Sequence, residues 1–236
     1  MWWTNSENQE IVYKVILKRE IIHTKDGSTT IHLPELEESY HSKHGAIQEA
    51  YHVFIKNGLS LFDSRPITIL EIGFGTGLNS FITYLESKKN NQAIDYVGVE
   101  AYPVLIDEAM QMNYPNEIDA NEHPIYKQMH QCNWEQENTL SDIFTLTKRK
   151  QFFQDIQDEA TFDLIYFDAF GFRVQPELWS EEIFIAMYKA LKQKGVLVTY
   201  ACRSSIKNAM LSAGFSVEKL PGAPGKREML RATKAV

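Results

Sequence analysis

The sequence predicts an α/β fold built on an open, mainly parallel β-sheet that is covered by helices on both faces. Two observations support this prediction. After Pro66, short apolar runs alternate with amphipathic helical stretches, which is typical of strand–helix–strand units in a parallel sheet. The first apolar run also leads directly into a glycine-rich turn and a helix, within the stretch "ILEIGFGTGLN" at residues 69–79.

The predicted elements follow one another in a simple order. Residues 11–33 alternate apolar and polar side chains around Lys25-Asp26-Gly27, which predicts a β-hairpin. Residues 44–58 place apolar side chains on one helical face and stop at Gly58, as expected for a glycine C-cap. The later predicted elements are strands at 67–72, 94–99, 162–167, 196–200, 215–220 and 228–233, the last two antiparallel, and helices at 76–87, 178–191 and 204–213.

The 236-residue chain is expected to divide into an N-terminal hairpin and helix extension (1–60) and an α/β domain (61–236). The polar stretch 148–161 is expected to be a surface excursion before the next strand. No apolar run is long enough to span a membrane, and no secretory signal is visible, so no membrane partner is expected. Cys132 and Cys202 lack metal-type spacing and suit unbridged thiols, which favours a cytoplasmic location.

The glycine turn predicts the kind of nucleotide that the fold holds. A dinucleotide fingerprint, G-x-G-x-x-G, would place its third glycine at position 78, where this chain has Leu78. The glycines here are Gly73, Gly75 and Gly77, and Glu71 precedes them at the end of the strand. A carboxylate there would repel a pyrophosphate but can accept hydrogen bonds from an ammonium group. The ligand is therefore expected to be a positively charged nucleoside without phosphate, which describes S-adenosylmethionine (SAM).

Polar residues also follow the later strands, where ligands bind in open α/β sheets. Glu100 ends the second strand and is placed to accept both ribose hydroxyls. The third candidate is Cys132-Asn133-Trp134, in which Asn133 would bond the adenine edge and Trp134 would pack on the ring. The fourth strand ends in Asp168. Each acid alone could be an exposed or helix-capping residue, but their placement at successive strand ends favours one shared site.

Asp168 suggests how such a site would work. Methyl transfer from a sulfonium is an in-line displacement, so the protein must position the nucleophile and remove its proton. An alkylamine, with a pKa of about 10, is mostly an unreactive ammonium at neutral pH. The Asp168 carboxylate can orient that amine and draw off its proton, while Phe170 and Phe172 form apolar walls.

Charge and the remaining motifs narrow the function classes. The net charge is −7, but residues 189–236 hold ten basic and two acidic residues, so this quarter of the chain carries +8 on an acidic remainder. It can be a phosphate-binding face or an ordinary solvated surface. His41, His44 and His52 have no cysteine or paired acid to complete a metal site, so no metal is expected. No P-loop and no nucleophilic serine elbow occur.

Four stretches together resemble one enzyme family. They are "DGSTTIHLPELEESYHSKHGAIQEAYHVFIKNGL" before the sheet, "LEIGFGTGLN" at the glycine turn, "FDAF" with "QPELW" after the fourth strand, and "AGFSVEKLPGAPGKREMLRA" near the end. The chain resembles, over most of its length, the SAM-dependent methyltransferase domain of the bifunctional MnmC-type bacterial enzymes. These enzymes make 5-methylaminomethyl-2-thiouridine at the tRNA wobble position. The glycine motif alone occurs in many methyltransferases, whereas the combination is far more specific.

The resemblance implies a class I, Rossmann-like methyltransferase fold with a seven-stranded sheet and an antiparallel last strand. It implies methylation of the primary amine of 5-aminomethyluridine in tRNA, with Asp168 facing the amine. Tyr40, His41 and Ser42 would close over the cofactor or substrate, and Lys226 and Arg227 would contact tRNA. The implied SAM shell comprises Glu71, Gly73, Gly75, Gly77, Asn79, Glu100, Asn133 and Asp168, together with Tyr40 and Ser42.

The chain departs from the family pattern at two places. The family usually has an acid where Asn133 stands, and a proline where this chain has Gly171-Phe172-Arg173. The FAD-dependent oxidase half does not fit within 236 residues, so a stand-alone methyltransferase is expected. Three alternatives remain from the residues alone: a SAM-dependent methyltransferase of a small-molecule or protein amine, an aminopropyltransferase of the same fold, and a non-catalytic tRNA-binding protein.

Overall fold

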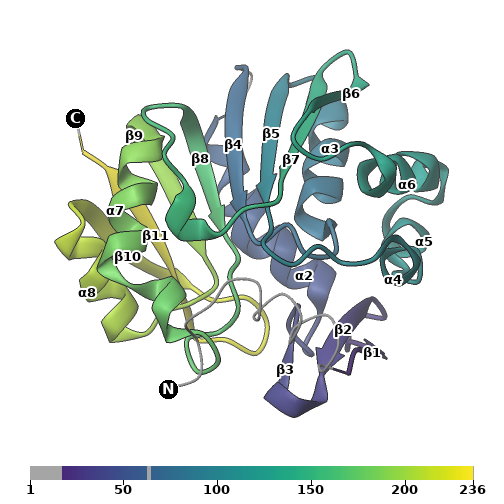
Figure 1. Ribbon diagram of the computed structural model, residues 1–236, viewed down its shortest axis with the longest axis horizontal. Coiled ribbons are helices and arrows are strands. Elements are labelled where there is room, and N and C mark those ends of the chain that lie inside the picture. Colours follow the sequence, from purple (N-terminus) through teal and green to yellow (C-terminus); the bar gives the residue numbers. More distant parts are fainter. Residues whose placement is uncertain (1–17, 63–64, 236) are drawn as a thin grey trace.

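A computed structural model describes residues 18–62 and 65–235, and its main feature is an eight-stranded sheet (Figure 1). The strand order is β10-β11-β9-β8-β4-β5-β7-β6. The five central strands from β9 to β7 are parallel, while β11 runs antiparallel to both of its neighbours. The strands are β4 (Ile67–Ile72), β5 (Ile94–Val99), β6 (Glu137–Ser141), β7 (Phe144–Arg149), β8 (Phe162–Phe167), β9 (Leu191–Thr199), β10 (Phe215–Pro221) and β11 (Glu228–Lys234).

This arrangement confirms the predicted methyltransferase-type fold. The six strands predicted by residue range are present, and the last one is antiparallel to its neighbours. β7 completes the seven strands that the resemblance implied, and β6 adds an eighth at the edge. Three predicted strands, 67–72, 94–99 and 162–167, have the predicted bounds. Each is a short run of mostly apolar and mostly buried residues, which stands out from the polar segments around it.

Helices cover both faces of the sheet because successive strand residues point to opposite sides. Ile69 and Tyr166 belong to one buried core, whereas Leu70 and Phe167 belong to another. The helices of the first face are α2 (Ala46–Ala50) with the π-helical turn η2 (Tyr51–Lys56), α3 (Leu78–Asn90) and α6 (His123–Gln131). Those of the second face are α7 (Glu181–Ala190) and α8 (Ser204–Ser212). The predicted two-sided covering is thus confirmed.

Capping explains where two predicted helices begin. The helix expected from residue 76 starts at Leu78, because Gly77 is its N-cap with a left-handed φ of 72°. The helix expected from residue 178 starts at Glu181, where the Ser180 side chain accepts a hydrogen bond from the N–H of Ile183. Residues 176–179 form a short 3₁₀ turn before this cap.

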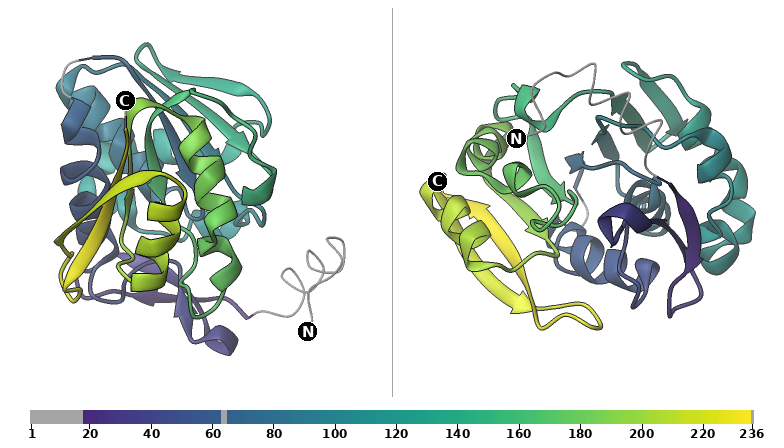
Figure 2. Two further views of the ribbon diagram at one scale, coloured as in Figure 1. Left: turned by 90° about the vertical axis from the view of Figure 1, so that its left-hand side faces the viewer. Right: turned by 60° about the horizontal axis from the view of Figure 1, so that its bottom comes forward.

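The N-terminal hairpin is confirmed for the described residues, while its predicted part at 11–17 lies outside them. β1 (Glu20–His23) pairs antiparallel with β2 (Thr29–Leu33), and β3 (Glu38–Ser39) completes a second sheet. This small sheet, purple in Figures 1 and 2, lies beside the lower ends of the large-sheet strands. Ile31 shares its buried core with Ile69, so the division at residue 60 stays a prediction.

Gly58 follows the predicted helix but is not a left-handed cap. The helix ends at Lys56 with Asn57 as its C-cap, and Gly58 is absent from the positions with positive φ. A Cβ atom at Gly58 would lie 2.5 Å from the carbonyl oxygen of Phe54. Glycine is therefore required here by close backbone approach.

The region between β5 and β8 is the part that the sequence did not predict. It contains α4 (Ile106–Ala109), α5 (Tyr114–Ile118), α6 and the hairpin of β6 and β7. The stretch 148–161 begins inside β7, so its first two residues are not a surface excursion. No helix in residues 18–62 and 65–235 is long and apolar enough to cross a membrane.

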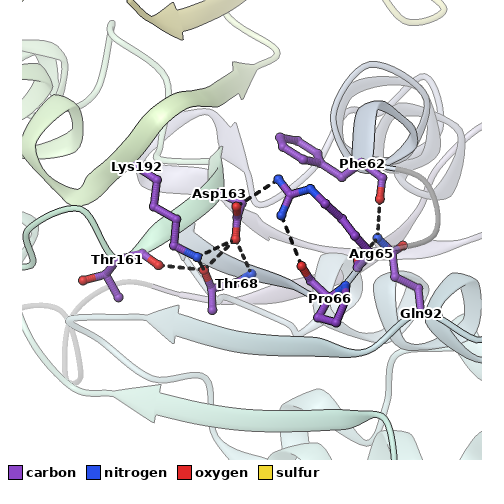
Figure 3. A network of polar contacts seen from close by, with 8 residues as sticks. All are labelled: Phe62, Arg65, Pro66, Thr68, Gln92, Thr161, Asp163 and Lys192. Atoms are coloured by element: carbon purple, nitrogen blue, oxygen red, sulfur yellow. Dashed lines mark hydrogen bonds and ion pairs between the residues drawn. The ribbon is translucent and has the colours of Figure 1, made fainter. Parts of the chain in front are cut away.

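Asp163 ties three segments together at the amino ends of the strands (Figure 3). Its carboxylate accepts hydrogen bonds from Lys192 at 2.8 Å, from the Thr68 N–H at 2.9 Å and from Arg65 at 3.0 Å. Burial alone would raise the pKa of Asp163, but these hydrogen bonds outweigh it and hold the pKa below its usual value.

We expect Asp163→Ala to lower the free energy of unfolding by about 1–3 kcal/mol at pH 7, the range for losing charged hydrogen bonds. The folded pKa lies below the unfolded value of about 3.9. This contribution is therefore complete above the unfolded pKa and is lost as the pH falls through the folded pKa. Urea unfolding at pH 7 and pH 3 measures both effects, and equal stabilities of variant and wild type at pH 7 would contradict the prediction.

Candidate active site

A cleft opens at the carboxyl ends of β4, β5 and β8. Residues from the small sheet, from the glycine turn and from the segments after four strands meet there. The lining residues are Ser39, Tyr40, His41, Gly73, Phe74, Gly75, Leu78, Asn79, Glu100, Ala101, Tyr102, Phe152, Phe153, Gln154, Asp168, Ala169, Phe170, Gly171, Gln175, Glu177, Leu178 and Tyr200. The predicted acids Glu100 and Asp168 thus share one site.

Two glycines of the turn shape the floor of the cleft. Gly73 has a φ of 89°, and a Cβ atom there would lie 2.6 Å from the Asp168 carbonyl oxygen. Gly75 has a φ of 50°, and its Cβ would lie 3.2 Å from the Tyr40 ring. Gly77 instead packs away from the cleft, where a Cβ would lie 2.9 Å from the His130 ring. The turn therefore gives a ligand close access to backbone at Gly73 and Gly75.

Glu100 is fixed at the end of β5 by two backbone donors. Its Oε2 accepts from the Gly75 N–H at 3.1 Å, and its Oε1 accepts from the Tyr102 N–H at 2.9 Å. Burial raises the pKa of Glu100, and these hydrogen bonds oppose the rise. Each carboxylate oxygen keeps a further lone pair, so Glu100 is held in place to accept two adjacent hydroxyls.

Asn79 connects Glu71 and Asp168 at the other end of the cleft. Its Nδ2 donates to Glu71 at 3.0 Å and to Asp168 at 2.8 Å. Its own Oδ1 is buried and has no hydrogen-bond partner within the described part of the chain. A buried acceptor without a partner is costly, so a ligand that brings an N–H donor, such as an ammonium group, would satisfy it.

Asp168 has an ionisation suited to proton exchange. Burial raises the pKa of Asp168 to about 7, against the opposing hydrogen bond from Asn79. The negative charge of Glu49 raises it further, and the positive charge of Lys226 lowers it. A group with a pKa near the working pH both accepts and releases protons readily. The rings of Tyr40 and Phe170 make an edge-to-face contact with their centres 5.0 Å apart, and they give this end of the cleft an apolar wall.

Two of the predicted cofactor residues lie behind the cleft instead of in its wall. Glu71 is fully buried, and its pKa is raised well above the usual value by burial and by the charge of Asp168. It borders the cleft through Asn79, so its position does not support a direct contact between its carboxylate and the ligand, and its part in cofactor binding stays a prediction. Ser42 does not line the cleft either; its backbone N–H donates to Glu49.

Asn133 does not follow a strand of the sheet, contrary to the prediction from the sequence. It follows α6, not a strand of the parallel sheet, and it lines a second cavity with Gly75, Trp134 and Lys148. The strand that ends beside β5 is β7, which the sequence did not reveal, and the residues after it are Phe152 and its neighbours. The predicted adenine contact of Asn133 is therefore not supported by its position.

Three predicted substrate residues also lie outside the cleft lining. Phe172 packs in the core of the second face, and the Arg203 guanidinium lies 4.7 Å from its ring centre. Lys226 forms an ion pair with Glu49. Arg227 is exposed. Phe170 is thus the one predicted apolar wall that the structure places in the cleft, because the chain turns away after Gly171.

Sequence reasoning missed Phe152, Phe153, Gln154 and Tyr200. The first three follow β7, and alternation in "FTLTKR" at 144–149 was the signal that could have revealed that strand. Tyr200 follows β9, and its hydroxyl donates to the Ala169 carbonyl at 2.8 Å. A search of the described residues finds no group of three or more His, Cys, Asp or Glu that could hold a metal ion.

An open α/β sheet with this cleft defines a class of nucleoside-cofactor enzymes, and comparison with known proteins identifies the family. A family model described as S-adenosyl-L-methionine-dependent methyltransferase matches residues 110–235. Because this match covers more than half of the chain, the protein belongs to that methyltransferase family.

Two curated relatives are similar over most of this chain. One is the tRNA 5-methylaminomethyl-2-thiouridine biosynthesis bifunctional protein MnmC of Campylobacter fetus subsp. fetus, with 29% identity over 84% of this chain and 33% of that protein. The protein of the same name from Delftia acidovorans is 28% identical over 86% of this chain and 33% of its own length. The chain thus spans about a third of the length of the relatives it matches.

Two solved structures share the fold. MNMC2 from Aquifex aeolicus has a TM-score of 0.75 and 22% identity, covering 100% of this chain and 80% of that chain. Spermidine synthase from Thermotoga maritima has a TM-score of 0.51 and 15% identity, covering 93% and 75%. At these identities the likeness concerns the fold alone.

Glu100→Ala is expected to weaken SAM binding by about 1–3 kcal/mol, because charged hydrogen bonds to the ribose would be lost. S-adenosylhomocysteine has the same ribose, so its affinity should fall by a similar factor. Titration calorimetry of both ligands measures this. A variant that discriminates strongly between them would place Glu100 near the sulfur.

Proposed function

We propose that this methyltransferase transfers a methyl group from SAM to the amine of 5-aminomethyl-(2-thio)uridine at the wobble position of tRNA. The observation that carries the proposal is Asp168, a partly protonated acid near neutral pH that shares one cleft with Glu100 and the glycine turn. The similarity to MnmC proteins over more than four fifths of the chain supports the choice of substrate. Since tRNA is the substrate, the proposed location is the cytoplasm.

The residues of the cleft suit SAM. Glu100 would hold the ribose hydroxyls, Gly73 and Gly75 would admit the ligand to the backbone, and the unpartnered Oδ1 of Asn79 would accept from the methionine ammonium. Bound SAM supplies an activated methyl group. Everything else that the reaction needs concerns the amine, which must arrive neutral and correctly directed.

Asp168 would perform that preparation. Asn79 holds its Oδ2, which leaves Oδ1 to accept a hydrogen bond from the substrate amine. The amine proton passes to this oxygen, and the nitrogen lone pair is freed for attack. The apolar wall that Tyr40 and Phe170 form also favours the neutral amine, because an apolar environment disfavours a charged ammonium.

The experiment that tests the proposal is mass spectrometry of wobble nucleosides. tRNA bearing 5-aminomethyl-2-thiouridine is incubated with SAM and enzyme, with the Asp168→Asn variant as control. One added methyl group on that nucleoside, formed far more slowly with the variant, is the expected result. Methylation of free amines without tRNA methylation would indicate a small-molecule enzyme, and SAM-independent tRNA binding without product would indicate a binding protein.

Arg227→Glu is expected to raise the KM for tRNA and to flatten its salt dependence, with SAM affinity unchanged. Arg227 is exposed on the loop after β10, whereas Lys219, Lys226 and Arg231 of the same quarter are already in ion pairs. Removing one phosphate contact should reduce the logarithmic salt slope by about one. Steady-state kinetics at several salt concentrations measure the slope.

Lys189→Glu is the matched control, because Lys189 is exposed at the end of α7, where its carbonyl pairs with Ala160 before β8. That position lies at the opposite end of the strands from the cleft. Equal salt slopes for Arg227→Glu and the wild type would contradict a phosphate contact of Arg227 and favour an ordinary solvated surface.

A further inference from the structure

We propose that Lys226 is a positioning residue of the methyl-transfer site, which offsets the charge of Glu49 and thereby keeps Asp168 ionised. The sequence suggested a tRNA contact for Lys226, but the structure places its ammonium beside the cleft. The inference rests on the proposed role of Asp168 and adds to it the group that sets its charge.

The ammonium of Lys226 is held in a defined position by two contacts. Its Nζ lies 2.5 Å from Oε1 of Glu49 and 3.9 Å from the ring centre of Tyr200. The ion pair and the cation–π contact approach the ammonium as two separate partners. Only 31% of the Lys226 side chain is exposed, and Glu49 is 8% exposed. A cation held in this way is poorly available to a phosphate.

Backbone packing keeps the loop that carries Lys226 against the segment before α2. Gly225 has a φ of 87°, and a Cβ atom there would clash with the His44 ring. The His52 ring bonds the Pro221 carbonyl at 2.8 Å. Glu49 is itself oriented by the Ser42 N–H, which donates to its other oxygen at 3.1 Å. The position of the Lys226 ammonium beside Glu49 is therefore fixed by the packing of the backbone.

Tyr200 lies between the Lys226 ammonium and the cleft that contains Asp168. Its ring lines the cleft, and its hydroxyl donates to the carbonyl of Ala169, the residue after Asp168. Burial raises the pKa of Tyr200 well above its usual value, and the charges of Asp168 and Glu49 contribute to the rise. Lys226, Glu49 and Asp168 are thus close enough to feel one another's charge.

Lys226 is the cation whose charge lowers the pKa of Asp168. Acids and phenols that interact electrostatically with Asp168 are Glu71, Glu49, Tyr96, Tyr114 and Tyr200. Burial raises the pKa of Glu71 well above its usual value, which disfavours its charged form. Glu49 is then the acid whose charge opposes ionisation of Asp168, and Lys226 compensates it.

The test compares variants that break the same ion pair but change charge in opposite directions. Lys226→Met leaves Glu49 unopposed, so the titration of Asp168 should move to higher pH. Glu49→Gln removes the repelling carboxylate, so it should move to lower pH. Lys226→Arg keeps the charge and should restore the wild-type position. Lys219→Met is the matched control, since it breaks the Lys219–Glu228 pair on the same hairpin.

Two readouts are measured. The carboxyl ¹³C shift of Asp168, assigned with Asp168→Asn, is titrated in the ligand-free protein. The acid limb of kcat is recorded with saturating SAM and tRNA. For Lys226→Met we expect the limb about one pH unit higher, which lowers kcat at pH 7 about five-fold. Circular dichroism and SAM binding verify that each variant is folded, and Lys226→Gln replaces Lys226→Met if the latter is not.

Shifts of the same sign in Lys226→Met and Glu49→Gln would overturn the inference, because the pair would then act only as a structural link. An unshifted limb with a higher KM and a flatter salt slope would also overturn it, in favour of a phosphate contact. If the wild-type enzyme fails to methylate aminomethyluridine, the proposed function fails, and the ¹³C titration still decides whether Lys226 controls Asp168.

Discussion

Asp168→Asn is expected to lower kcat by about 10²–10⁴, the usual contribution of a general base. Asparagine keeps the size of the side chain and can hydrogen-bond Asn79, but it cannot take a proton from the amine. Affinities for SAM and tRNA should change far less, because Glu100 and the glycine turn are untouched. Single-turnover kinetics with saturating SAM separate the chemical step from binding.

The pH dependence makes this prediction sharper. The wild type should lose activity below pH 7, since the pKa of Asp168 is about 7 and only the ionised form accepts the proton. The variant should lack this limb and should gain activity as the pH rises, because more of the amine is then already neutral. Loss of SAM affinity with kcat retained would move Asp168 into the cofactor shell. The base would then be sought first at Tyr40 or at His41, whose pKa burial lowers to about 4.

Gly75→Asp is expected to abolish SAM binding in a folded protein. A side chain at this position enters the space against the Tyr40 ring, and its carboxylate lies near Glu100, which the Gly75 N–H now bonds. The ligand would lose both room and the hydroxyl acceptor. Calorimetry measures the affinity, and binding within ten-fold of the wild type would reject the placement of the cofactor.

Gly214→Asp provides the matched control for backbone strain. Gly214 also has a positive φ, 102°, and a Cβ atom there meets only the Tyr188 ring at 3.4 Å. Both variants place a non-glycine residue at a positive φ, at a cost of about 1–2 kcal/mol. Only the change at Gly75 should alter SAM affinity.

The sequence predicted the parts of the fold in which local pattern and burial agree. β4, β5 and β8 are mostly buried, so their apolar runs stand out from the chain. β6 does not stand out, because it is a partly exposed edge strand with a single buried residue, and α4 and α5 are too short to show a helical period. Missing β6 and β7 moved the predicted third strand end to Asn133.

The site residues that the sequence predicted well are those beside correctly predicted strands. Gly73, Gly75, Glu100 and Asp168 are adjacent to strands that were predicted correctly, and the cleft contains all four. Glu71 shows what sequence position does not reveal, since Asn79 from the next helix lies between it and the cleft. Lys226 and Glu49 are 177 positions apart, and only the folding of the β10–β11 loop onto α2 brings them together.

Tyr40 gives the small N-terminal sheet a part in the timing of catalysis. Its ring lies against Gly75 at the cofactor end and against Phe170 at the amine end, so one side chain closes both compartments. If SAM binds at Gly75 as proposed, release of the spent cofactor on this side would require the Tyr40 ring to move outward. A substitution that weakens the packing of the small sheet would then be expected to speed product release and to admit water to the reacting amine.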